Sequence, residues 1–115
     1  FKWTDELGNV NPNGSVMSAG RLDYRIVVGG LEANLGEHHL TFEKIVVGKS
    51  GQELVHDPVE FDRVFEENAE GIPRARLQMF VLLENAEPGE YDLVLKISDN
   101  LSGETLEHKE HFEIK

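Results

Sequence analysis

Residues 9–14 have side chains of the types that could coordinate a calcium ion. Three asparagines place oxygen atoms at alternate positions of this segment, and Gly14 follows where a sharp turn would be needed. A complete calcium loop also needs a bidentate glutamate at its twelfth position, and that position is Gly20. Amide oxygens also carry no charge to balance a divalent cation. We therefore interpret the segment as an asparagine-rich turn.

Two acidic segments, residues 66–70 and 84–90, are a second candidate for calcium. If folding brought both segments to one end of the molecule, their carboxylates could share an ion. Runs of charge are more typical of solvated surface than of a metal site. We keep a calcium-stabilised adhesion domain as a further alternative function, and we predict no resident cofactor.

The histidines do not have the spacing of a metal site. His38 and His39 are adjacent, and His108 and His111 are three residues apart, so on a strand the members of each pair point to opposite faces. His56 would have to be brought to one of these pairs by folding. We expect solvent-facing strand histidines and no metal.

The chain lacks the short motifs that indicate catalysis. It contains no Gly-x-Ser-x-Gly, no glycine-rich phosphate loop and no His-Glu-x-x-His. It also contains no cysteine, which excludes thiol nucleophiles, disulfides and cysteine-based metal sites. Among 22 acidic residues some carboxylates lie close together by chance, so their number does not indicate a glycosidase. We predict that the protein is not an enzyme.

The charge balance narrows the classes of partner. Eleven basic and 22 acidic residues give a net charge of −11, which disfavours nucleic acid and anionic lipid because both attract basic proteins. No apolar stretch approaches the ~20 residues of a membrane span. The length of 115 residues suits one domain. We expect a single domain, residues 1–115, excised from a larger protein, with residues 1–20 forming a linker plus a weak first strand.

Apolar and polar residues alternate with the period of β-strands along most of the chain. In residues 22–28 the apolar positions predict one buried face, with Asp23 and Arg25 facing away. In residues 40–47 the phase slips before Ile45, which predicts a bulge or a change of sheet. Residues 77–83 are almost wholly apolar and predict a central strand packed on both faces, with Phe80 in the core. The pattern predicts these further core residues: Leu77, Met79, Val81, Leu93, Leu95 and Ile97.

Residues 57–71 leave two interpretations open, a short helix or a strand. Asp57 is a candidate N-cap, Pro58 occupies the first helical position and Glu60 lies three residues after the cap. An extended run from Val59 to Phe65 would instead supply a crossing strand. The sequence therefore predicts an all-β fold of about seven strands, typical of a β-sandwich, with at most one short helix at residues 58–68.

The turn and strand around Tyr91 carry a resemblance to a known family. Pro88 and Gly89 make a turn into a strand, and the spacing of Tyr91 lets its ring cover the end of a core while its hydroxyl bonds to nearby backbone. This pattern resembles the tyrosine corner of Greek-key sandwiches. With the alternation and turns that follow, it is similar to the C-terminal half of bacterial extracytoplasmic immunoglobulin-like or fibronectin type III-like domains. The resemblance implies a Greek-key β-sandwich in which Pro88, Gly89 and Tyr91 are structural residues.

The same resemblance implies a non-catalytic module in a larger extracytoplasmic protein, whether periplasmic, on the cell surface or secreted. Such a module serves protein interaction or acts as a spacer, and its partners are other domains of the parent protein or a separate protein. The alternative is a carbohydrate-binding module that binds a polysaccharide by stacking an aromatic ring on a sugar. Trp3 is the candidate ligand contact for that alternative, although a place in a first strand at the sandwich edge would equally explain it.

Overall fold

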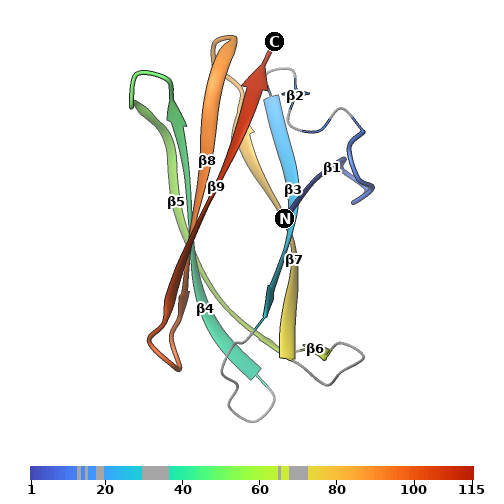
Figure 1. Cartoon of the computed structure of the whole chain (residues 1–115), viewed down its shortest axis with the longest axis vertical. Helices are drawn as coiled ribbons and strands as arrows, with labels where there is room; N and C mark the ends of the chain where they lie inside the picture. The colour runs from blue at the N-terminus through green and yellow to red at the C-terminus, as the bar shows by residue number, and fades with distance from the viewer. Residues whose placement is uncertain (13, 15, 18–19, 30–36, 65, 68–72) are drawn as a thin grey trace.

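The computed structural model describes residues 1–12, 14, 16–17, 20–29, 37–64, 66–67 and 73–115. Figure 1 shows their strands arranged in two layers. The strands are β1 (Lys2–Thr4), β2 (Val16–Met17), β3 (Gly20–Gly29), β4 (Glu37–Gly48), β5 (Glu53–Val64), β6 (Glu66–Glu67), β7 (Pro73–Leu83), β8 (Gly89–Asp99) and β9 (Thr105–Ile114). The described residues form no helix, and so none that could cross a membrane.

The two layers are a four-stranded sheet in the order β1-β3-β7-β6 and a five-stranded sheet in the order β2-β9-β8-β4-β5. All neighbouring strands are antiparallel except the short β2, which runs parallel to β9. The predicted all-β sandwich is confirmed, and the arrangement is compatible with an immunoglobulin-like domain. Of the nine strands described, β1, β2 and β6 have only two or three residues each.

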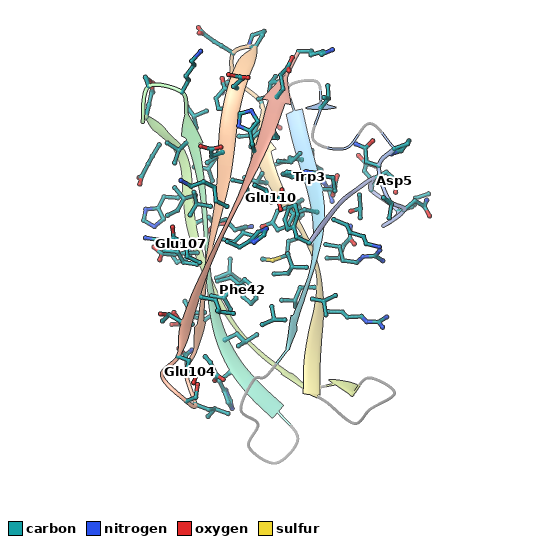
Figure 2. The ribbon with its side chains drawn as sticks, in the orientation of Figure 1. Trp3, Asp5, Phe42, Glu104, Glu107 and Glu110 are labelled. Carbon is teal, nitrogen blue, oxygen red and sulfur yellow. The ribbon has the colours of Figure 1, made fainter. Side chains whose placement is uncertain are left out.

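The core lies between the two sheets and is built from alternate residues of the long strands, as period-two patterning requires. Five of the six side chains predicted in the core are buried, and the sixth, Met79, is partly buried and packs against the others. Tyr24, Phe42 and Phe112 are the largest fully buried side chains. Figure 2 shows Phe42 in the space between the layers.

β7 differs from the prediction that residues 77–83 pack on both faces. Leu77, Val81 and Leu83 are buried, whereas Phe80 is 44% exposed and Leu82 is 52% exposed. The prediction that Phe80 lies in the core was therefore wrong. A continuous apolar run does not reveal whether a second layer covers it, and here only one face of β7 meets the other sheet.

The segment that could have been a helix is a strand as far as the structure describes it. β5 pairs with β4 in unbroken antiparallel register from Asp57 to Val64, so the ladder satisfies backbone groups that a helix would have satisfied internally. Pro58 is tolerated because β5 lies at the edge of its sheet. Phe65 and residues 68–72 lie outside the described residues.

The predicted phase slip in β4 was misplaced. Leu40, Phe42 and Val46 keep one phase and are fully buried, and Lys44 occupies the inward position between them. The irregularity in the pairing with β5 falls later, between Val46 and Val47. The alternation of apolar residues alone gave the wrong phase, because the inward position 44 is occupied by a lysine.

Candidate functional site

The corner at Tyr91 has the predicted geometry. The Tyr91 side chain is buried, and its hydroxyl donates a hydrogen bond to the backbone carbonyl of Glu87, across the turn that contains Pro88 and Gly89. The Tyr91 ring also stacks on Phe112, with 5.7 Å between ring centroids. These contacts fix the end of the core and leave the hydroxyl engaged, so this corner supports the fold and offers no free group to a ligand.

Trp3 lies at the edge of the core, beside β3 (Figure 2). Its side chain is only 9% exposed. The indole meets Phe1 edge-on at 4.8 Å and Phe112 at 5.8 Å between centroids. Stacking on a sugar requires an open ring face, and the position of Trp3 is the one expected of a first strand that covers the sandwich edge.

The asparagine-rich segment begins with a turn that Asp5 organises. The Asp5 carboxylate accepts hydrogen bonds from the backbone amides of Leu7 and Asn9. These bonds, with the Asn9 amide as the largest contributor, hold the pKa of Asp5 below its usual value. Asn13 lies outside the described residues. The Asp5 carboxylate is therefore already used by the turn.

His56, His108 and His111 each pair with a carboxylate. His56 Nε2 lies 2.5 Å from Glu43 Oε1, His108 Nε2 lies 2.7 Å from Glu110 Oε1, and His111 Nδ1 lies 3.1 Å from Asp92 Oδ1. The bond from His56 lowers the pKa of Glu43. The side chains of His38 and of residues 66–70 lie outside those described. Among the side chains that are described, no three acidic or histidine groups are placed to hold one metal ion.

A cleft of about 270 Å³ opens between β3 and β9. Its walls are mainly aliphatic, from Ile26, Val28, Leu95 and Leu106. The one imidazole at its edge, His108, is already bonded to Glu110. A small-molecule site normally combines apolar walls with several converging polar groups, so this cleft has little with which to orient a ligand.

The outer face of the four-stranded sheet is different, because it combines arginines with exposed apolar side chains. We call it the arginine face and define it as the outward positions of β1, of residues 21–27 in β3 and of residues 76–82 in β7. In β3 the outward residues alternate with the buried ones, and the antiparallel register places β7 residues beside them. The residues of the arginine face are Lys2, Thr4, Arg21, Asp23, Arg25, Val27, Arg76, Gln78, Phe80 and Leu82.

Arg21 is held in place on the arginine face. Its Nε donates a 3.0 Å hydrogen bond to Asp23 Oδ1, and its guanidinium carbon lies 4.1 Å from the centre of the Phe80 ring. Asp23 was predicted to face solvent, but it is only 7% exposed, because Arg21 and Phe80 flank it. This arrangement presents a fixed guanidinium beside an exposed aromatic ring, within the range of a cation–π contact.

Lys44, on the other sheet, contacts the backbone of Phe80. Its Nζ donates to the backbone carbonyl of Phe80 at 3.1 Å and lies 3.4 Å from Asp57 Oδ2. β6 pairs with β7 only at Arg74 and Pro73, so at Phe80 β7 has a described neighbouring strand, β3, on one side only. Lys44 thus crosses between the sheets and satisfies a backbone acceptor at this open edge.

The charge of the arginine face is opposite to that of the whole chain. The face holds four basic residues and one acidic residue, so the rest of the chain holds seven of the 11 basic and 21 of the 22 acidic residues. Asp5 and Glu6 lie on the adjoining turn, and Asp5 is engaged by that turn. A positive surface in a strongly acidic protein creates a local potential that favours negatively charged partners.

Sequence reasoning missed the arginine face. It assigned Phe80 to the core. A signal was present: Arg21, Arg25 and Val27 share the outward parity of β3, and Phe80 and Leu82 fall on that of β7. The antiparallel pairing of these two strands was needed to bring them together.

No protein-family model matches the chain, and no curated protein matches it in sequence.

Proposed function

We propose that the chain is a non-catalytic, immunoglobulin-like module that serves protein interaction within a larger extracytoplasmic protein, and that the arginine face is its binding surface. The observation that supports this proposal is the group of exposed apolar side chains on one sheet face: Val27 (51% exposed), Phe80 (44%) and Leu82 (52%). Phe80 and Leu82 are adjacent outward positions of β7, and exposed apolar surface rimmed by polar residues is typical of protein–protein contact sites.

The composition of the face favours a protein as its partner. Aromatic residues and arginine are enriched at protein interfaces and dominate their binding energy. Arg21 and Phe80 are stacked on each other, and the bond to Asp23 fixes the guanidinium before any partner arrives. A side chain that is already ordered loses less conformational entropy on binding. A pure spacer would need only a solvated outer face.

Site-specific photo-crosslinking in the full-length parent protein, expressed in its source cells, tests the proposal. A photoreactive amino acid at position 82 should give a discrete protein adduct. The matched control is position 106, because Leu106 is a leucine of similar exposure (59%) on the other sheet. No protein adduct from position 82, or an adduct from position 106 alone, would contradict the assignment of the arginine face.

A further inference from the structure

We propose that the arginine face binds an extended acidic segment of a partner protein, in which two carboxylates lie four residues apart with an apolar side chain between them. This inference rests on the proposed function and specifies the chemistry of the partner. We argue it from the spacing of the arginines, their hydrogen-bonding capacity, and the exposed apolar side chains, of which Phe80 lies between the two arginines.

The spacing comes from β3. Arg21 and Arg25 are four residues apart on one face of this strand, a separation of roughly 13 Å at about 3.3 Å per residue. An extended segment lying along β3 repeats at the same interval, so carboxylates at its first and fifth positions would lie near the two guanidinium groups. Its third position would then lie near Phe80, the register partner of Asp23.

Both guanidinium groups have donors available for carboxylates. An arginine has five N–H donors in a planar fork, and Arg21 uses one of them, at Nε, for Asp23. Arg25 makes no ion pair with any described residue. A carboxylate accepts two parallel hydrogen bonds from a guanidinium, which supplies both energy and orientation.

The apolar side chains favour a protein segment over a sulfated polysaccharide. Val27, Phe80 and Leu82 would remain hydrated beneath a ligand made only of charged and hydroxyl groups, whereas aliphatic side chains of a peptide would cover them. Outside the arginine face the chain is strongly acidic, and it would repel a long polyanion that extended beyond the face. A short acidic segment can keep its charges over the arginines.

The test uses a synthetic eleven-residue peptide with glutamates at two positions four residues apart, a leucine midway between them and neutral polar residues elsewhere. Binding is measured by fluorescence anisotropy at low salt. We expect saturable binding that weakens severalfold when salt is raised, because screening reduces the attraction between exposed charges. Replacing both glutamates by glutamine, or the leucine by serine, should weaken binding about tenfold or more.

Charge reversal on the protein locates the peptide. Arg25→Glu should weaken binding by at least about tenfold, while Lys109→Glu, which makes the same change in net charge on the outer face of β9, should change it less than about twofold. Arg25→Gln serves as a second variant, and thermal unfolding confirms that each variant is folded. Equal effects of Arg25→Glu and Lys109→Glu would overturn the proposal.

Two further outcomes are decisive. Tighter binding of a sulfated polysaccharide or of single-stranded DNA than of the peptide would assign the face to a polyanion and overturn the proposal. Absence of peptide binding together with a protein adduct from position 82 would overturn the acidic-segment chemistry while leaving the proposed function intact. Absence of both would remove the proposed function as well.

Discussion

The outer faces of the two sheets differ in how far their apolar side chains are exposed to solvent. On the five-stranded sheet, Ile45 and Val94 face outward as direct register partners, yet they are only 6% and 8% exposed. On the four-stranded sheet, Phe80 and Leu82 also face outward but are 44% and 52% exposed. On the five-stranded sheet, neighbouring side chains cover these two apolar residues. On the four-stranded sheet, Phe80 and Leu82 remain in contact with solvent.

Strand position explains much of this difference. β4 and β8 have neighbouring strands on both sides, so Ile45 is flanked by Val94 and His56, and Val94 is also flanked by Lys109. The long stems of such polar side chains cover apolar neighbours while their charges stay in water. At Phe80 and Leu82, β7 has a described neighbour on one side only. The two outer faces therefore differ in how much apolar surface they leave to solvent, which supports the proposal that the arginine face is the binding surface.

Truncating one apolar side chain on each face should give the largest difference between the faces in the free energy of unfolding. Ile45→Ala should lower the free energy of unfolding by about 2–3 kcal/mol, because it removes buried methyl groups and leaves a cavity. Leu82→Ala should lower it by no more than about 0.5 kcal/mol, since half of that side chain is already exposed. Urea denaturation measures both. Equal losses would mean that the two faces do not differ in this way.

The two tyrosines beneath the faces should respond in opposite directions to loss of the hydroxyl. Tyr91→Phe should cost about 1 kcal/mol, because the hydroxyl is bonded to Glu87. Tyr24→Phe should gain about 1 kcal/mol, because the buried Tyr24 hydroxyl has no hydrogen-bond partner among the described residues. Chemical denaturation of both variants checks the signs, and a loss at Tyr24 would contradict the described packing.

The dependence of stability on alkaline pH gives a second test of the burial of Tyr24. Burial, with a smaller contribution from the charge of Asp57, raises the pKa of Tyr24 well above its usual value of 10.0. The unfolded chain ionises this phenol near pH 10 and the folded chain does not, so stability is full below pH 10 and falls as the pH rises. Tyr24→Phe should reduce this alkaline loss. An unchanged pH profile would contradict the burial of the phenol.

Removing the charge of one carboxylate on each face, Asp23 or Glu43, should give a smaller difference in stability between the two faces. Asp23→Asn keeps the shape of the buried side chain but removes its charge, and it should cost about 1 kcal/mol because Arg21 loses a charge-assisted bond that solvent partly screens. Glu43→Gln, at the exposed pair with His56, should cost less. Thermal unfolding compares the two. The reverse order would show that the five-stranded face depends more on its ion pairs.

The smallest effect should be a change in titration. The hydrogen bond from His56 lowers the pKa of Glu43 below its usual 4.5. Because the folded pKa is depressed, the associated stability is present above pH 4.5 and is lost as the pH falls through the folded pKa. In His56→Gln the Glu43 carboxyl should titrate closer to 4.5, as measured by carbon NMR. An unchanged titration midpoint of Glu43 would show that the bond to His56 does not cause its lowered pKa.

The sequence was sufficient to predict the strands and most of the core, because period-two alternation reports which face of a strand is buried. It also predicted the corner at Tyr91, where Pro88 and Gly89 make the turn locally. It was insufficient for residues 57–64, where the local sequence left both a short helix and a strand open, and pairing with β4 produced a strand.

The arginine face could not be predicted for a related reason. An apolar run such as residues 77–83 looks the same whether one or two layers cover it. Asp23 is buried only because Arg21 and Phe80 come together across two strands. Lys44 faces inward because a carbonyl on the opposite sheet and Asp57 receive it. Each of these depends on contacts between segments that are distant in the chain.

Hydroxyl-radical footprinting can show whether a partner covers the arginine face. The oxidation rates of Phe80 and Leu82 would be compared between the isolated chain and the full-length parent protein in extracts of its source, with Leu106 as an exposed reference on the other sheet. The account predicts severalfold slower oxidation of Phe80 and Leu82 in the native context and an unchanged rate at Leu106. Unchanged rates at Phe80 and Leu82 would contradict the assignment of the arginine face as the binding surface.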